Sequence, residues 1–509
     1  MRTKKPFLIA LFLCAWTIVS YYLLIRQTDS SNGSNHQTAT GTVDARRHRD
    51  SLLRQLDRLE SNIEEENVIH DVMVKKLIEI IRLKDKKDGA AIAAKVTQLK
   101  NVTTKHSNGI DVILVEAKPH PNAIDSLDAP DILDNEIKAS NTETELNDID
   151  APIINRLKEL NQRKHDFKGP IIPVVVFACN RISVSNCLDD LVQYRTSAEQ
   201  FPIIVSQDCN DEPTKKVIES YKDITFMRHP DQSDIFVLPK EKKFKGYYKI
   251  ARHYGWALNT TFKAGFEYVI IVEDDLNVSP DFFEYFMGTH ELLKNDSSLW
   301  CVSAWNDNGK SNNIDVSSPE LLYRTDFFPG LGWMLTKNLW TELSPKWPKA
   351  FWDDWIRQPQ QRKERACIRP EISRTRTFGK IGVSNGMFFD KHLRYIKLNE
   401  QMVKFTKMNL THLLKQNYDK QFLNHVYSCP VLTFEEVRRG LVSVKGPVRI
   451  QYNTKDQYKR TAKLLGLMDD FKSGVPRTGY LGIVSFYYNN QRVYLAPSSN
   501  WRGYDLSWS

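Results

Sequence analysis

The pattern of hydrophobic and polar positions is most regular between residues 171 and 272. Four mainly apolar runs, at 171–177, 201–205, 224–227 and 266–272, alternate with stretches of helical spacing at 185–194, 212–221 and 247–263. Short apolar runs of this kind are typical of strands that are buried on both faces of a parallel sheet. The alternation predicts a doubly wound α/β sheet of four strands, with Ser185 as the N-cap of the first helix.

The pattern changes beyond about residue 380. Residues 448–452, 482–487 and 492–496 have the length of short strands, and residues 455–468 have the spacing of a helix. We therefore expect one domain at 169–380, followed by a linker and a smaller α+β C-terminal domain at 381–509.

The beginning of the chain has the pattern of a membrane anchor. Residues 7–25 carry no charge, and these 19 residues are long enough to cross a hydrocarbon core about 30 Å thick. Arg2, Lys4 and Lys5 precede the run, so the positive-inside rule predicts a cytosolic tail at 1–6 and a luminal location for the chain after residue 25. A cleaved signal peptide is the alternative, but the run is longer than a usual signal core and no small-residue cleavage site comes after it. We expect a retained single-pass type II anchor.

Residues 26–168 have the composition of a stalk. Phe167 is their one aromatic residue, and they contain no cysteine. A heptad-like stripe within residues 51–100 fits a short coiled coil and a solvated amphipathic helix equally well. Residues 111–150 are acidic and have a linker composition. We expect a partly helical luminal stalk, which would also allow self-association through the anchor and stalk.

Composition places the globular part of the protein after residue 168. The chain has 509 residues, 41% of them hydrophobic, and residues 169–509 hold all but six of the aromatic residues and all but one of the 7 cysteines. The protein is therefore neither globally disordered nor a small disulfide scaffold. Its net charge of +9 is modest and no basic helix or RNA-binding signature accompanies it, so we expect no nucleic-acid partner.

Polar side chains come directly after three of the predicted strands. They are Asn180 and Arg181 after the first, Asp208 after the second, and Glu273, Asp274 and Asp275 after the fourth. Ligands of such sheets bind beyond the carboxyl ends of the strands. The glycine-rich motifs of dinucleotide-binding and P-loop proteins do not occur in this region, which disfavours both classes. Three adjacent carboxylates need a cation or hydrogen bonds, and oxygen ligands suit Mg²⁺ or Mn²⁺. The alternative is a solvated loop whose acids cap the next helix near Asp281.

A second acidic motif lies at residues 351–355, where Asp353 and Asp354 are flanked by three large aromatic residues. A carboxylate against aromatic rings tends toward a raised pKa, which suits a general base. A surface turn whose rings face the core is the alternative, and the pattern alone slightly favours it. Residues 240–249 carry five lysines, which fit a diphosphate-binding loop less well than a solvated basic loop. His253, on the next helix, has the position of an ordinary helix-face histidine.

The most specific features of the sequence are long strings rather than short motifs. They include FPIIVSQDCN at 201–210, GYYKIARHYG at 246–255, VEDDL at 272–276, PDFFEYFM at 280–287, LWCVSAWNDNGKS at 299–311, PELLYRTDFFPGLGWM at 319–334, PKWPKAFWDDWI at 345–356, RACIRPEISRTR at 365–376 and FKSGVPRT at 471–478. In these strings residues 170–509, about two thirds of the chain, closely resemble the N-acetylglucosaminyltransferase I family.

The resemblance implies a GT-A fold, Rossmann-like and doubly wound, in which residues 169–380 bind the nucleotide-sugar and the metal. Members of the family are inverting Golgi enzymes that move N-acetylglucosamine from UDP-N-acetylglucosamine, in β-1,2 linkage, to the α-1,3-arm mannose of the Man5GlcNAc2 N-glycan. That step initiates hybrid and complex N-glycans. The same reaction is expected here, with Mn²⁺ as the cofactor and a luminal head at the Golgi membrane. Two alternatives remain, a transferase that acts on O-linked mannose and a non-catalytic, membrane-tethered glycan-binding protein.

The resemblance also implies roles for particular residues. It makes Asp353 the general base, with Asp354 in second place, and Asp275 the direct metal ligand. The residues that it implies as contacts of the donor are Arg181, Asp208, His253, Glu273, Asp274 and Ser384.

The cysteines of the globular head are expected to pair. Cys179 and Cys209 end neighbouring strands, so their Cα atoms can lie within the limit of about 7 Å for a disulfide. The resemblance suggests Cys301 and Cys367 as a second pair. Cys187 is then expected to be a free, reactive thiol near the donor site.

Overall fold

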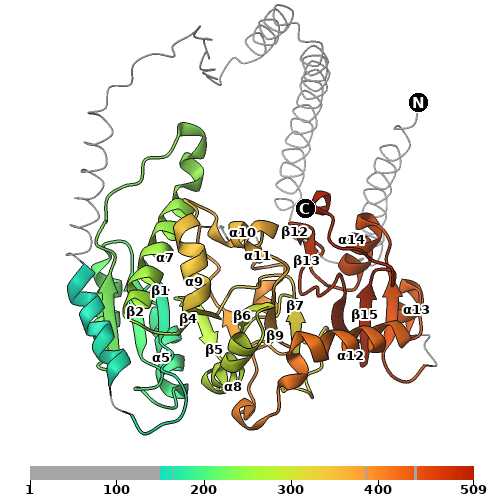
Figure 1. The fold of residues 1–509 in the computed structure, drawn as a ribbon. Coiled ribbons are helices and arrows are strands. Elements are labelled where there is room, and N and C mark those ends of the chain that lie inside the picture. The colour runs from blue at the N-terminus through green and yellow to red at the C-terminus, as the bar shows by residue number, and fades with distance from the viewer. Residues whose placement is uncertain (1–149, 164, 384–385, 387, 441–443) are drawn as a thin grey trace, which may run out of the picture. The chain divides into compact units, whose positions relative to one another are not determined.

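The computed structural model describes residues 150–163, 165–383, 386, 388–440 and 444–509. All of these residues belong to one compact unit, whose elements are labelled in Figure 1. The predicted anchor at 7–25 and the predicted stalk up to residue 149 lie outside the described residues. Within the described ranges, no helix is long and apolar enough to span a membrane.

The larger part of the described chain alternates strands and helices. After a helix at residues 150–162, the elements come in the order β1 (Val174–Ala178), α5 (Val184–Tyr194), β2 (Ile203–Gln207), α6 (Glu212–Glu219), β3 (Ile224–Arg228), the 3₁₀ turn η1 (Pro239–Phe244), α7 (Lys245–Lys263), β4 (Tyr268–Glu273), β5 (Leu276–Val278), α8 (Phe282–Asn295), β6 (Leu299–Ser303), β7 (Leu322–Thr325), β8 (Trp333–Thr336), α9 (Lys337–Leu343), α10 (Trp352–Ile356), α11 (Pro359–Arg362), β9 (Ala366–Pro370) and β10 (Thr375–Thr377).

Eight of these strands form one sheet, in the order β3-β2-β1-β4-β8-β6-β9-β7. The first four strands are parallel, as predicted, and β8 and β7 run antiparallel to their neighbours, so the sheet is mixed. The chain moves outward from β1 through β2 to β3 and then returns to place β4 on the other side of β1. The strand order therefore reverses between β1 and β4, and a crevice at such a switch point is where open α/β sheets bind ligands.

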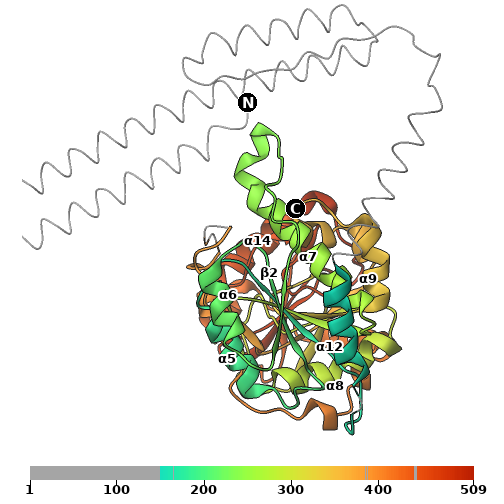
Figure 2. The ribbon, with the colours of Figure 1, turned by 90° about the vertical axis from the view of Figure 1, so that its left-hand side faces the viewer.

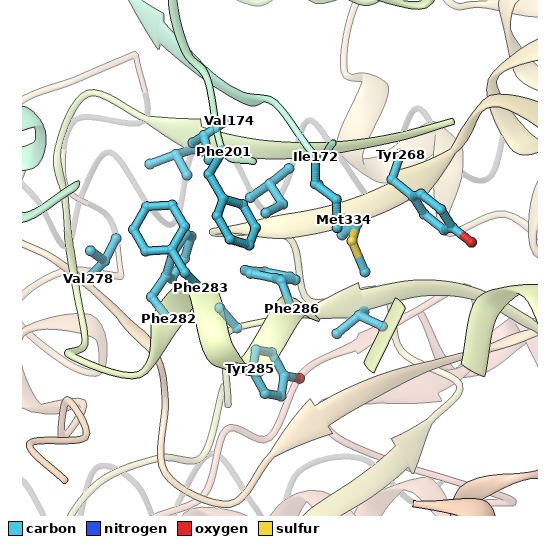
Figure 3. Close-up of a cluster of buried hydrophobic side chains, with 14 of the residues drawn as sticks. Ile172, Val174, Phe201, Tyr268, Val278, Phe282, Phe283, Tyr285, Phe286 and Met334 are labelled. Atoms are coloured by element: carbon cyan, nitrogen blue, oxygen red, sulfur yellow. The ribbon is translucent and has the colours of Figure 1, made fainter. Parts of the chain in front are cut away.

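Side chains of alternate strand residues enter different hydrophobic cores. Val174 and Val176 of β1 face the core beneath α5, α6 and α8, whereas Val175 and Phe177 face the core beneath α7 and α9. This period of two explains why the strand reads as a continuous apolar run, since both faces are covered. In Figure 2, α5 and α6 lie on one side of the fan of strands and α7 and α9 on the other. Figure 3 shows the aromatic side chains of α8, such as Phe282 and Phe286, packed toward Phe201 and Met334.

The rest of the chain builds a smaller α+β region with a core of its own. Its elements are α12 (Lys415–Ser428), α13 (Phe434–Arg439), β11 (Val448–Gln451), α14 (Lys455–Leu464), the hairpin β12 (Phe471–Lys472) and β13 (Val475–Pro476), β14 (Val484–Tyr488) and β15 (Gln491–Ala496). Strands β11, β15 and β14 form a three-stranded sheet in that order, near the predicted positions.

Three predictions of local structure need correction. The first helix begins at Val184 after Ser183, so Ser185 is inside the helix and does not cap it. The predicted helix at 455–468 ends at Leu464 because Gly466 adopts a left-handed φ of 79° and turns the chain. The helix at 150–162, which falls in the predicted stalk, packs on the sheet with Leu157 fully buried, so the head begins before residue 169.

Candidate active site

The carboxyl ends of β1 and β4 bring a basic and two acidic side chains together. Arg181 lies on the loop after β1, and its guanidinium Nε is 3.1 Å from Oδ1 of Asp274. The Nη2 atom of the same guanidinium is 3.6 Å from Oδ2 of Asp275 and donates to the carbonyl of Ile381 at 2.9 Å. The structure thus joins the first and fourth strand ends, which the sequence predicted to converge at one edge of the sheet.

The acidic triplet after β4 is mostly shielded from solvent, with the side chains of Asp274 and Asp275 14% and 17% exposed and paired with Arg181, so the alternative of a solvated capping loop is wrong. Burial raises the pKa of Glu273 to about 8, and the charges of Asp275 and Asp274 add to the shift. Burial also raises the pKa of Asp274 to about 6, although Arg181 opposes that shift. The pKa of Asp275 is raised by burial as well, again against the effect of Arg181. Arg181 thus pairs with two carboxylates, Asp274 and Asp275, which leaves a net negative charge when both are ionised.

The residues of this cluster fit a divalent cation. All the donors are carboxylate oxygens, which Mg²⁺ and Mn²⁺ prefer. Gly379 lies directly over Asp275, since a Cβ atom at that glycine would be 2.0 Å from Oδ2 of the carboxylate. In the part of the chain that the structure describes, no group of three or more His, Cys, Asp or Glu side chains is arranged to hold a metal ion. A cation here would accordingly depend on one or two carboxylates, with substrate oxygens and water as its other ligands.

A second polar cluster lies at the end of β2. Asp208 is buried and accepts a hydrogen bond from the side-chain amide of Gln232 at 3.4 Å. His253, on α7, is buried with its Nε2 atom 2.7 Å from the hydroxyl of Ser206. Burial lowers the pKa of His253 to about 3, so the ring is neutral at physiological pH. His253 is thus a buried, hydrogen-bonded side chain, and neither it nor Asp208 touches the acidic triplet.

Disulfide Cys179–Cys209 joins the loops after β1 and β2, with a Cα–Cα distance of 5.2 Å. It ties the loop that carries Arg181 to the strand end that carries Asp208. A second disulfide, Cys301–Cys367, links β6 to β9.

The free thiol of Cys187 differs from its prediction. It is fully buried on α5, with Sγ 3.7 Å from the carbonyl of Glu273. Burial, and then the charges of Asp274 and Asp275, raise the pKa of this thiol. The thiolate is the reactive form of cysteine, so Cys187 is inert rather than reactive.

The Asp353–Asp354 pair lies on α10, and the two carboxylates have different partners. Arg357, one turn further on, donates to Asp353 at 3.0 Å and to Asp354 at 3.2 Å. Lys472 of β12 binds Asp354 as well, with Nζ 2.9 Å from Oδ1. Burial alone would raise the pKa of Asp354, but the hydrogen bond from Lys472 and the charge of Arg357 outweigh it and lower the pKa. The raised pKa that the aromatic flanks predicted is therefore wrong for Asp354, which is held as an ion by two cations.

Two aromatic residues connect α10 to the acidic triplet. The ring of Trp352 stacks on Tyr254 of α7 with centroids 4.6 Å apart. The hydroxyl of Tyr254 donates to Oε1 of Glu273 at 3.0 Å. The charge of Asp353 contributes to the raised pKa of Glu273, so the two acidic motifs also interact electrostatically. Tyr254 therefore lies between the pair and the triplet, in contact with α10 on one side and with Glu273 on the other.

Sequence reasoning missed Tyr254, Arg357 and Lys472. Arg357 could have been found, because it stands four residues after Asp353 and that spacing pairs side chains on a helix. Tyr254 and Lys472 reach the site only through tertiary contacts. Residues 240–249 show no phosphate-binding arrangement: Lys245 and Lys249 both pair with Asp234. Ser384 lies outside the described residues.

Two sequence comparisons match most of this chain to known proteins. A protein-family model described as the GNT-I family matches residues 130–508. A protein of Arabidopsis thaliana named alpha-1,3-mannosyl-glycoprotein 2-beta-N-acetylglucosaminyltransferase is 41% identical over 330 residues, which cover 64% of this chain and 74% of that protein.

Two solved structures resemble the chain distantly. S. aureus TarS 1–349 has a TM-score of 0.28 and 13% identity, and covers 39% of this chain and 58% of its own. The mannosyltransferase PcManGT from Pyrobaculum calidifontis, in complex with GDP-Man and Mn²⁺, has a TM-score of 0.24 and 14% identity, and covers 38% of this chain and 53% of its own. This chain thus spans less than two thirds of either structure, and the family assignment depends on the two sequence matches.

An acidic cluster at a switch point, with a separate carboxylate nearby, suits an enzyme that holds an activated donor beside an acceptor. The two sequence matches identify the class of this enzyme: it is a glycosyltransferase. The family model covers most of the chain, including every described site residue. The chain belongs to the GNT-I family.

Proposed function

We propose that this protein is an inverting transferase of GT-A fold that moves N-acetylglucosamine from UDP-N-acetylglucosamine, in β-1,2 linkage, to the α-1,3-arm mannose of the Man5GlcNAc2 N-glycan. The chain belongs to the GNT-I family, and the observation that carries the proposal is that its acids fall into two groups. One is the largely shielded triplet Glu273–Asp275, and the other is the half-exposed Asp353. Inversion is a single displacement at the anomeric carbon, so it requires one base and no enzyme nucleophile.

The donor is proposed to bind at the carboxyl ends of β1, β2 and β4. Asp208 and His253 would flank its nucleotide, and Glu273 and Asp274 would contact the nucleotide-sugar. Arg181 holds the Asp274 carboxylate in place and presents the one positive charge of the cluster. Asp275 is the proposed ligand of Mn²⁺, which, when bound, supplies positive charge against the UDP leaving group.

The acceptor is proposed to bind on the side of Asp353. The carboxylate of Asp353 would take the proton of the mannose 2-hydroxyl while that oxygen attacks the anomeric carbon and the bond to UDP breaks. Arg357 fixes the orientation of the carboxylate without occupying all of its lone pairs. Asp354 is a poorer candidate, because Lys472 and Arg357 both hold it and its pKa is lowered.

The test is an acceptor comparison. The full-length protein is incubated with UDP-N-acetylglucosamine and Mn²⁺, in parallel with a Man5GlcNAc2 glycan and with an O-mannosyl peptide. The proposal expects transfer to the glycan and loss of that transfer when the metal is chelated. Transfer to the peptide alone would identify the O-mannose alternative, and transfer to neither would favour a non-catalytic glycan-binding protein.

We also propose that the head is luminal and tethered to the Golgi membrane through the segment at 7–25, with self-association through anchor and stalk. The uncharged run and the basic residues before it support this proposal. A protease-protection assay on intact vesicles tests it, since the head should be degraded only after detergent is added.

A further inference from the structure

A cavity of about 270 Å³ lies in the C-terminal region, apart from the acidic site at the ends of β1 and β4. It is a half-open pocket lined by the residues after β11, the β12–β13 hairpin and the last residues of the chain. Its lining residues are Tyr452, Asn453, Phe471, Gly474, Pro476, Pro497, Ser498, Trp501, Gly503, Tyr504, Asp505 and Trp508. Its volume is near the lower end of the usual range for small-molecule sites, about 300 Å³.

The walls of this cavity are held by interactions of their own. The hydroxyl of Tyr504 donates to Asp326 at 2.6 Å and accepts from the amide of Gly482 at 3.0 Å. The ring of Trp501 packs edge-on against Tyr504 with centroids 4.9 Å apart. Trp508 packs in the same way against Phe471 at 5.5 Å. The aromatic rings are therefore fixed in place before any ligand arrives.

The chemistry of the lining suits a neutral sugar. Trp501, Tyr504 and Trp508 are half-buried, so each ring presents some surface to a ligand. Asn453, Ser498 and Asp505 add polar groups, whereas the lining contains no lysine, arginine or histidine that could neutralise an anion. A pyranose has an apolar face of C–H groups and an edge of hydroxyls, and thus matches both kinds of wall. In the described chain no protein acceptor bonds the indole N–H of Trp501, which leaves it available to a hydroxyl.

The cavity adjoins the catalytic end of the molecule through strand β12. Phe471 lines the cavity, and the next residue, Lys472, binds Asp354 beside the proposed base. Successive residues of a strand point to opposite sides, so the cavity and the Asp353–Asp354 pair flank one short strand. Asp326, which holds Tyr504, directly precedes Phe327, whose ring lies 5.0 Å from the guanidinium of Arg357.

We propose that this cavity is an auxiliary binding site for a neutral pyranose, and that it takes a second mannose of the branched acceptor whose reactive mannose lies at Asp353. The identity of that sugar rests on the proposed function, whereas the sugar-binding character of the cavity does not. The site would increase the affinity for branched glycans without taking part in the chemical step.

Ligand-observed NMR of the full-length protein with methyl α-mannopyranoside tests the site directly. Trp501→Ala removes the stacking surface, and Asn453→Ala removes an exposed polar group that contributes little to folding. Leu506→Ala is the matched control, because Leu506 belongs to the same segment, is 55% exposed and does not line the cavity. Thermal unfolding of each variant verifies that it is folded.

Trp501→Ala is expected to weaken binding of the probe about tenfold, which corresponds to ~1.4 kcal/mol of binding free energy. Asn453→Ala is expected to show a smaller but measurable loss of binding. Binding should be unchanged in Leu506→Ala. Undiminished binding in folded Trp501→Ala or in folded Asn453→Ala would overturn the site.

Kinetics separate this inference from the proposed function. Trp501→Ala is expected to raise KM for the Man5GlcNAc2 glycan about tenfold while kcat stays unchanged and KM for a single-mannose acceptor is unaffected. If the wild type transfers to the glycan but Trp501→Ala and Leu506→Ala have equal KM values, the auxiliary site is refuted. If the wild type transfers to no acceptor, the proposed function fails and the NMR result alone decides whether the cavity binds sugar.

Discussion

Replacing Asp353 by asparagine is expected to abolish most turnover while leaving the donor site intact. The substitution keeps the shape of the side chain and the turn of α10, but an amide cannot accept the proton of the acceptor hydroxyl. Asp354→Asn is the matched control, because it makes the same chemical change one residue away on the same helix.

The two substitutions are expected to lower kcat by different factors. General-base catalysis contributes about 10²–10⁴-fold, and Asp353→Asn should lower kcat by that factor. Asp354 is 44% exposed and pairs with Lys472 and Arg357, and half-exposed pairs of this kind contribute about 0–1 kcal/mol each. Asp354→Asn leaves the proposed base in place and removes only these two pairs, at most about 2 kcal/mol together, so it should lower kcat by less than about 30-fold.

Turnover with the Man5GlcNAc2 glycan and calorimetry of UDP-N-acetylglucosamine with Mn²⁺ measure the two effects separately. Both variants should bind the donor nearly as well as the wild type. If Asp354→Asn loses the larger part of the activity, the roles of the two acids are reversed. If Asp353→Asn loses donor binding together with turnover, Asp353 belongs to the donor site and the division of the acids is wrong.

Other parts of the structure make three further predictions. Asp275→Ala should abolish Mn²⁺-dependent binding of UDP-N-acetylglucosamine in calorimetry, and normal binding would exclude this residue as the metal ligand. His253 has a pKa of about 3 in the folded protein and about 6.5 in the unfolded chain. Between these two pH values the imidazole is protonated only in the unfolded chain, so the free energy of unfolding falls as the pH decreases. Between pH 7 and pH 5 the wild type should consequently lose about 2 kcal/mol more than His253→Gln in denaturant titrations, and equal losses would refute a neutral buried His253. A fragment that starts at residue 169 lacks the fully buried Leu157 and should be less stable than one that starts at residue 130. The expected difference is at least about 2 kcal/mol, the contribution of one buried leucine, and equal midpoints in thermal unfolding would contradict this packing.

The sequence predicted the parallel strands β1 to β4 and the group of polar residues at their carboxyl ends, because the burial of these strands leaves a clear local pattern. Strands β1 to β4 are buried on both faces, so each appears as a continuous apolar run that ends in polar residues. Convergence of Arg181 with Asp274 and Asp275 is a consequence of topology alone, because the carboxyl ends of adjacent parallel strands meet at one edge. Strands β6 to β9 were not predicted, since their pairing depends on long-range contacts and a mixture of directions that a local pattern does not reveal.

The position of Asp353 depends on a different level of structure. Its motif could be read as a surface turn, because nothing within residues 351–355 tells which side of α10 faces the sheet. The deciding contacts are the stacking of Trp352 on Tyr254 and the hydrogen bond from Tyr254 to Glu273, which join a five-residue helix to a strand end about eighty residues earlier. The rings pack in the core, and Arg357 and Lys472 hold the carboxylate of Asp354 instead, so its pKa is lowered and not raised. A strand end can thus be assigned from local sequence, whereas an acid on a short helix acquires its role only when the helices on one face of the sheet have packed together.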